Sequence, residues 1–210
     1  ISLAGDAFDS SIMEHDISPH LGSHITFKLP MGRNIMSMPK HLLHKLYSPA
    51  HIAFLGRHEC KEILDLISRF SIDNEQEAKL SQLITLVEEH QGYYLFAKIE
   101  EEKRILSSKA ETEFQFIFPG IYIRQVLNQK KYEKNSKGLV EKIVTTLDET
   151  LRQAGLNYND IEIVCLTGGT AKIPAIQEAL TIRFGKEKMS EFKNFHSIIN
   201  GLGYFAQKTL

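Results

Sequence analysis

The segment IEIVCLTGGTAKIP, residues 161–174, carries the strongest fold signal in the chain. An apolar run that ends in paired glycines predicts a buried strand entering a tight turn, and Pro174 occupies the first helical position, which proline favours. Glycine lacks a Cβ, so the backbone at Gly168 and Gly169 can approach a ligand closely. The start of the next helix presents free N–H groups, as in a nucleotide cradle. For a bare glycine pair, an ordinary strand-to-helix turn is the simpler interpretation.

Three predicted elements precede this segment. Apolar residues recur every three to four positions from about 74 to 108, with a break near Gln91 and Gly92, so we expect two helices or one kinked helix. Residues 112–124 alternate around a turn at Pro119 and Gly120, which predicts a strand pair. A polar link at 128–137 then leads to a helix that Gly155 ends.

The remaining segments are less regular. We expect a helix at about 7–17, a poorly defined stretch at 18–40 with one short strand or arm, and two helices between 39 and 70. Pro174 opens a helix that Gly185 ends, and a last helix closes the chain.

A second candidate site lies at the end of the helical segment, where residues 100–108 read EEEKRILSS. On a helix Glu100, Lys103, Arg104 and Ser107 occupy positions i, i+3, i+4 and i+7 and share one face. The side chains of such a polar stripe can together bind one ligand. A solvated face laced with ion pairs is the simpler alternative, because charge runs usually have that role.

Composition excludes some classes of partner. The 210 residues carry 25 Lys+Arg and 26 Asp+Glu, a net charge of -1, which creates no general field for nucleic acid or a membrane surface. No apolar stretch is long enough for a membrane helix. Cys60 and Cys165 lie far apart, and Cys165 sits in an apolar run, so we expect it to be buried and unreactive, which fits a reducing cytoplasmic setting.

Histidines gather near the start of the chain, at His15, His20, His24, His41, His44, His51 and His58. Two pairs have spacings that allow a shared metal, but no carboxylate or cysteine pattern completes a zinc signature. We therefore assign no metal ligand and no catalytic residue, and expect the histidines to serve packing or the surface.

The motifs at 100–108 and 167–174, in this order and about sixty residues apart, resemble those of the heat-shock protein 70 (DnaK-type) chaperones. The second motif is also similar to the adenosine motif of actin and the sugar kinases. The resemblance implies a nucleotide site at Glu100, Lys103, Arg104, Ser107, Gly168, Gly169, Thr170 and Lys172. It further implies that Lys172 covers the adenine base and that Glu100 accepts hydrogen bonds from the ribose.

Two weaker pieces extend the resemblance. Residues 3–9, LAGDAFD, are similar to the chaperone segment after the second phosphate loop, which implies that Gly5 lies beside the nucleotide. Residues 197–203 look like the last helix of the superfamily. The chain departs from the family at Phe195 and His196, where chaperones carry an acidic residue, and from about residue 12 to 79. These departures suggest a divergent branch, similar to the YegD-like bacterial homologues.

The resemblance implies an α/β fold, a ribonuclease-H-like lobe of the actin-like ATPase type with a mixed sheet and an added, mainly helical subdomain. We expect residues 1–9 and 109–210 to form the lobe core and 10–108 the helical clamp. The implied function is binding of ATP or ADP, with Mg²⁺, in a chaperone-type ATPase. The alternatives are a fragment of an actin-like or sugar-kinase-like enzyme and a protein-interaction module without nucleotide.

The family's first phosphate loop, its catalytic Lys and Glu, and its Asp-x-Gly-Gly-Gly loop do not occur in the 210 residues. The chain opens at Ile1, and we expect it to be the second half of a longer ATPase domain, inactive alone. The implied partners are the missing first lobe, client proteins and co-chaperones, and the implied location is the cytoplasm.

Overall fold

The computed structural model describes residues 5–191 and 197–209 of the 210. Contacts divide the chain into two compact units. One, called here the helical unit, is Asp6–Asn135, and the other, the glycine-turn unit, joins Ile1–Gly5 to Ser136–Leu210.

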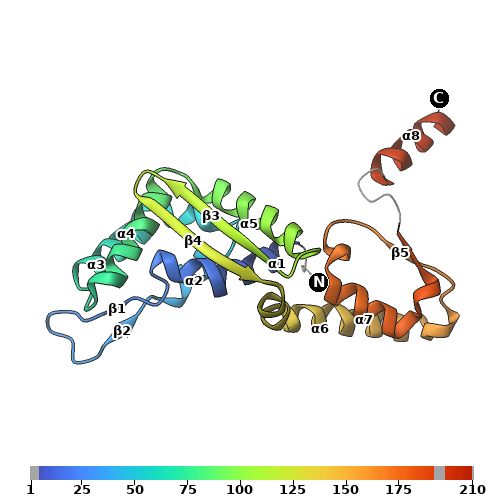
Figure 1. Cartoon of the computed structure of the whole chain (residues 1–210), viewed down its shortest axis with the longest axis horizontal. Coiled ribbons are helices and arrows are strands. Elements are labelled where there is room, and N and C mark those ends of the chain that lie inside the picture. The colour runs from blue at the N-terminus through green and yellow to red at the C-terminus, as the bar shows by residue number, and fades with distance from the viewer. Residues whose placement is uncertain (1–4, 192–196, 210) are drawn as a thin grey trace. The chain divides into compact units, whose positions relative to one another are not determined.

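Five α-helices and a hairpin form most of the helical unit (Figure 1). The helices are α1 (Gly5–Ile12), α2 (Lys40–Leu46), α3 (His58–Arg69), α4 (Asn74–Glu88) and α5 (Gly92–Leu106). After α1 the chain continues as a π-helical turn, Met13–Ile17, and a 3₁₀ turn, Ser18–Leu21. A further 3₁₀ turn, Ile52–Gly56, separates α2 from α3.

Helix boundaries follow local chemistry. The side chain of Asp73 caps α4 by accepting a hydrogen bond from the backbone N–H of Glu75 at 2.8 Å. His90, with a φ of 54°, lies between α4 and α5 in the left-handed region. The predicted break near Gln91 therefore separates two helices, and the region from 39 to 108 is mainly helical, as expected.

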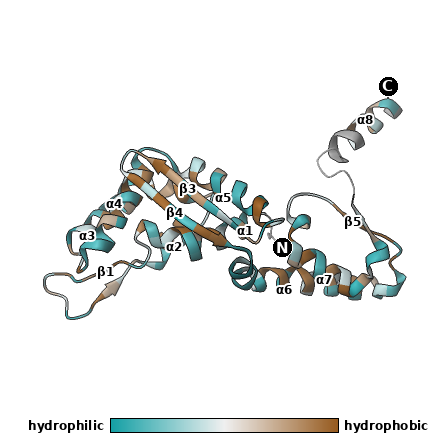
Figure 2. Cartoon of the chain, viewed as in Figure 1, coloured by the Kyte–Doolittle hydropathy of each residue, from teal (hydrophilic) through white to brown (hydrophobic). Residues whose placement is uncertain are grey.

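The hairpin consists of β3 (Glu111–Phe118) and β4 (Ile121–Asn128), paired antiparallel with Phe118 opposite Ile121. Gly120 at the turn has a φ of 81°, a conformation that glycine adopts without strain. β3 packs against α5, and apolar and polar residues mix along both strands (Figure 2). Phe114 and Ile123 are completely buried, which places one hairpin face in the core and confirms the alternation seen in the sequence.

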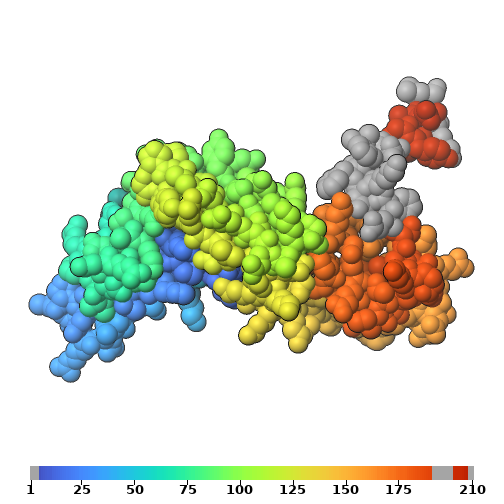
Figure 3. All heavy atoms as spheres, in the orientation of Figure 1, coloured from blue at the N-terminus to red at the C-terminus, as the bar shows by residue number. Residues whose placement is uncertain are grey.

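A short arm leaves the helical unit between β1 (Thr26–Phe27) and β2 (Met36–Ser37), which pair antiparallel. Its outer part projects from the unit in the space-filling view (Figure 3). Met31 is fully exposed there, whereas Phe27 at the base is buried. The arm is thus anchored only at its base.

The glycine-turn unit contains a strand–helix–strand connection. β5 (Val164–Leu166) leads through the glycine turn to α7 (Pro174–Phe184) and then to β6 (Met189–Glu191), which pairs parallel to β5. Parallel strands joined by a helix are the building unit of α/β sheets. The unit also contains α8 (Ser197–Thr209) and most of α6 (Gln129–Ala154), which ends where Gly155 adopts a φ of 68°.

Three expectations need correction. Residues 129–137, predicted as a link, form the start of α6, because Gln, Lys and Glu favour helix and polarity alone does not make a loop. Cys165, predicted buried, is exposed, since β5 alternates between covered and open faces. The described strands form three two-stranded sheets rather than one mixed sheet.

The two compact units do not coincide with the predicted domains. The hairpin packs on α5 and α4 and so falls within the helical unit, whereas the predicted boundary at 108–109 assigned it to the lobe core. That division of residues 1–9 with 109–210, and of 10–108, stays a prediction.

Candidate nucleotide-binding residues

The polar stripe predicted at 100–107 lies on the last two turns of α5. Glu100 accepts from Arg104 Nη2 at 2.5 Å, and the two side chains are 49% and 70% exposed. Ser107, which caps the helix, donates to the carbonyl oxygen of Lys103 at 3.3 Å. The ion-pair interpretation of the charge run is therefore correct for Glu100 and Arg104, and the exposure of this pair leaves both groups open to a ligand.

Lys103 has a different environment from its neighbours. Its Nζ lies 2.7 Å from Asp9 Oδ1, and only 12% of the Lys103 side chain and 10% of the Asp9 side chain are exposed. Asp9 belongs to α1, so this ion pair joins the first helix of the chain to the end of α5. The pair fixes the position of the Lys103 amine.

Burial raises the pKa of the Asp9 carboxyl above its ordinary value, although the hydrogen bond and positive charge of Lys103 oppose the shift. The charges of Glu100 and Asp6 add to the increase. Burial also raises the pKa of the Tyr132 phenol, with the charges of Asp9 and Glu133 as further causes. Negative charge at Asp9 is thus costly in this place and depends on the lysine for its compensation.

Two acidic residues of this region were not among the predicted site residues. Glu102 is 3% exposed, and its carboxylate contacts Lys98 Nζ at 2.8 Å and Thr112 Oγ1 at 2.5 Å. Its position matches the apolar spacing of Leu95, Ile99 and Leu106, which was a usable signal in the sequence. Asp9 gave no such signal, because only the fold brings it to Lys103.

The glycine turn lies between β5 and α7. Gly168 has a φ of 79°, and Thr170–Lys172 form a 3₁₀ turn in which the Lys172 amide donates to the Gly169 carbonyl at 3.1 Å. Among the described residues, no heavy atom lies within 4 Å of a Cβ built on Gly168 or Gly169. The backbone at both positions is open to an incoming group, as a nucleotide cradle requires.

The predicted residues therefore fall into two sets. Glu100, Lys103, Arg104 and Ser107 lie together on α5 of the helical unit, and Gly168 to Lys172 lie together in the glycine-turn unit. Gly5, the half-buried first residue of α1, is grouped with the glycine-turn unit. The motif residues Leu3 and Ala4, and the departure at 195–196, lie outside the described residues. That Glu100 faces Lys172 stays a prediction.

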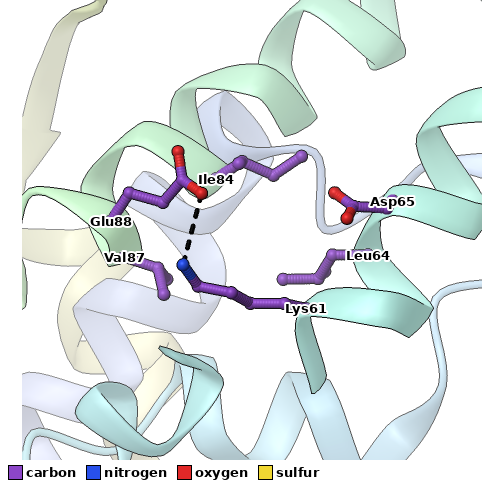
Figure 4. Close-up of a pocket in the computed structure, with 6 residues that line it drawn as sticks. All are labelled: Lys61, Leu64, Asp65, Ile84, Val87 and Glu88. Carbon is purple, nitrogen blue, oxygen red and sulfur yellow. Dashed lines mark hydrogen bonds and ion pairs between the residues drawn. The ribbon is translucent and has the colours of Figure 1, made fainter. Parts of the chain in front are cut away.

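Two pockets of the helical unit lie away from the predicted site. A water-sized pocket of about 10 Å³ between α3 and α4 is crossed by the ion pair of Lys61 Nζ and Glu88 Oε1, 3.2 Å apart (Figure 4). An apolar pocket of about 120 Å³ is lined by Ile52, Ala53, Leu86, Val87, His90, Gly92 and Tyr93. Neither pocket contains a residue of the polar stripe.

The part of the chain that the structure describes contains neither a metal-binding cluster nor a membrane-spanning helix. Within residues 5–191 and 197–209, no three His, Cys, Asp or Glu side chains lie close enough together to hold a metal ion. No helix in the same ranges has the length and apolar character needed to cross a membrane.

A model of the Hsp70 protein family matches residues 74–202, which include both predicted motifs in the family's order. Because the match covers more than half of the 210 residues, the chain belongs to the Hsp70 family. The membership assigns it to the chaperone-type nucleotide-binding domains, and its mixture of helices and sheets fits an α/β actin-like ATPase lobe. Proteins of this family generally depend on ATP and Mg²⁺.

Proposed function

We propose that the chain binds the adenosine part of an adenine nucleotide through the polar stripe of α5 and the glycine turn, within a chaperone-type ATPase. The observation that carries the proposal is the family match, which spans both motifs in order. The open space around the backbone of Gly168 and Gly169 supports it, because a ligand can approach the turn closely there.

In this proposal each residue has a distinct role. Glu100 accepts hydrogen bonds from the ribose hydroxyls, and the stem and charge of Lys172 cover the adenine base, which a cation can do favourably. Gly168 and Gly169 allow the nucleotide to approach the backbone, and the open space around them suits this role. Arg104 leaves its exposed pair with Glu100 to contact the ligand. Gly5 and Thr170 line the same site.

The proposal also covers the topology of the lobe, the partners of the chain and its location. The lobe has the ribonuclease-H-like topology, and the chain works with a first lobe that supplies the phosphate loops and Mg²⁺ site for hydrolysis. The protein is a cytoplasmic, YegD-like bacterial homologue whose partners are client proteins and co-chaperones. The 210 residues alone then bind adenosine without hydrolysing ATP, because phosphoryl transfer needs the metal and cationic groups of those loops.

Calorimetric titration of adenosine, ADP and ATP into the chain tests the proposal, with guanosine as the matched control and saturation-transfer NMR to detect weak binding. Because the proposed contacts involve base and ribose, the three adenine ligands should bind within about tenfold of one another, a difference below about 1.4 kcal/mol. Guanosine has the same ribose and an aromatic base that Lys172 can also cover, so it measures how far binding depends on the identity of the base, and removal of Mg²⁺ should change nothing. Absence of any adenosine signal contradicts the proposal, as does Mg²⁺-dependent ATP turnover by the repurified chain.

A second candidate function is a protein-interaction module that has lost nucleotide binding. One observation favours it: the charged groups of the α5 stripe are already satisfied by Glu100 with Arg104 and by Lys103 with Asp9. The same titration separates the two functions, because an interaction module gives no adenosine signal.

A further inference from the structure

A lysine and a cysteine of the helical unit lie in direct contact, away from the proposed nucleotide site. Lys45 stands in the last turn of α2 and Cys60 in the first turn of α3. Lys45 Nζ lies 3.2 Å from Cys60 Sγ and donates a hydrogen bond to it. Both helices pack on the 3₁₀ turn Ile52–Gly56 between them, which holds the two side chains near each other.

The surroundings of this pair are unusual for a lysine. Cys60 is 4% exposed and Lys45 is half-buried. Among the ion pairs of the described residues, none involves Lys45, so the sulfur takes the place where a lysine ordinarily has a carboxylate. Reactive cysteines occur beside cationic groups, near helix N-termini and in partly exposed places; Cys60 has the first two features, whereas its own exposure is only 4%.

The distance also suits a reaction. Groups held about 3–3.5 Å apart are in near-attack range, and such positioning makes an intramolecular step far faster than the bimolecular one. An oxidised cysteine, the sulfenic acid, condenses with a backbone nitrogen to form a sulfenamide, an S–N bond that thiols reverse. In this chain the amine of Lys45 is the nitrogen in position.

We propose that Lys45 and Cys60 are an oxidative cross-linking site, at which peroxide produces a reversible Sγ–Nζ sulfenamide between α2 and α3. The Cys60 thiol first reacts with hydrogen peroxide to give Cys60–SOH and water: the O–O bond breaks, the sulfur loses two electrons, and each peroxide oxygen gains one. The neutral Lys45 amine then attacks the sulfur, hydroxide leaves, and the amine proton joins it as a second water. A thiol reductant cleaves the S–N bond and restores both side chains.

Cys165 is the internal comparison for this chemistry. It is exposed in β5, and no lysine hydrogen bond is found for it in the described part of the chain. The same peroxide dose should therefore oxidise Cys165 to oxygen-bearing acids or to intermolecular disulfides. Its state reports how much oxidant the protein has received.

The experiment treats the chain with hydrogen peroxide at mildly alkaline pH. Alkylation of free thiols, trypsin digestion and peptide mass spectrometry follow. A linked Lys45 resists trypsin, so peptide 41–57 should remain uncut and joined to peptide 58–61, with a mass about 2 Da below their sum because two hydrogens are lost. Reduction should separate the peptides and restore cleavage after Lys45.

Two variants serve as matched controls. Lys45→Arg keeps the positive charge and the donor but lacks the attacking amine, and Cys60→Ser removes the sulfur. Neither should give the linked pair, and Cys60 of Lys45→Arg should proceed to the sulfinic acid. The proposal fails if trypsin cuts after Lys45 as before while Cys165 is oxidised. A linked pair about 14 Da heavier than the sum would place an oxygen between the atoms and overturn the direct S–N bond.

Discussion

The polar stripe of α5 and the glycine turn after β5 differ in how their atoms are held. In the stripe the amine of Lys103 is fixed by a buried carboxylate, and Glu100 is paired at the surface. In the turn the backbone is open around Gly168 and Gly169. The stripe is therefore ordered by charges and the turn by backbone conformation, so each should respond to a different kind of substitution.

The largest expected effect comes from Lys103→Met, which leaves Asp9 buried without its cation. Removing one member of a buried pair costs about 3 kcal/mol of unfolding free energy at neutral pH. Because Lys103 opposes the raised pKa of Asp9, its loss should raise that pKa further. Urea unfolding followed by circular dichroism measures the change, since the chain has no tryptophan.

The pH dependence gives this prediction its sign. A carboxyl whose pKa is higher in the folded state binds more protons folded than unfolded, so stability falls as pH rises from the ordinary value of 3.8 through the raised pKa. The cost of Lys103→Met should therefore be small near that ordinary value and grow toward neutral pH. In an Asp9→Asn background the pH dependence should vanish, and Lys103→Arg should retain most of the stability. If Lys103→Met lowers the free energy of unfolding equally near pH 3.8 and at neutral pH, this interpretation is wrong.

The second largest effect should come from substitutions in either half of the proposed site, which should weaken ADP binding. A charged acceptor for the ribose contributes about 1.5–3 kcal/mol, and a cation over the base about 0.5–2 kcal/mol. Glu100→Ala or Lys172→Ala should thus raise the Kd for ADP roughly threefold to a hundredfold, at about 1.4 kcal/mol per factor of ten. Calorimetric titration measures this, with unchanged circular dichroism as the control for folding. If both variants bind ADP as tightly as the unsubstituted chain, the nucleotide assignment is wrong.

The fold was predictable where one local signal dominated. Alternation at 112–124 predicted the hairpin, and i, i+3, i+4 spacing predicted α4 and α5 with their break. The start of α6 was missed because its polar residues are good helix formers as well as loop residues. β6 was missed because a three-residue strand has no periodicity, and its pairing with β5 depends on the whole connection.

The same division applies to the candidate site. The shared face of Glu100, Lys103 and Arg104 follows from helix geometry, and so does the ion pair of Glu100 with Arg104. The partner of Lys103 does not, because Asp9 is more than ninety positions away and only the fold brings it to the lysine. Helix geometry predicts from the sequence which residues share a face. The free-energy cost of a negative charge at Asp9 depends on its burial, which only the fold determines.

A matched pair of substitutions in the glycine turn should have a smaller effect. Gly168 has a φ of 79°, and an alanine in the left-handed region costs about 1–2 kcal/mol. Gly169 has a φ of -68° and open space around it, so Gly169→Ala should change stability by less than about 0.5 kcal/mol. Thermal unfolding should show a decrease of about 2–4 °C per kcal/mol for Gly168→Ala alone. Equal shifts for the two variants would show that backbone strain does not control this turn.

The smallest expected effect is the contribution of the Glu100 and Arg104 pair to stability. Both side chains are largely exposed, and exposed i,i+4 pairs contribute about 0.3–0.5 kcal/mol, which salt reduces further. A double-mutant cycle of Glu100→Ala and Arg104→Ala, measured by urea unfolding at low and high salt, should give a coupling below about 0.5 kcal/mol that fades with salt. Glu100→Ala would then separate ligand binding from folding, because it should weaken ADP binding far more than it destabilises the chain. A coupling free energy above about 1 kcal/mol that persists in high salt would show that the pair stabilises the fold. Glu100 and Arg104 would then not be available to bind a ligand.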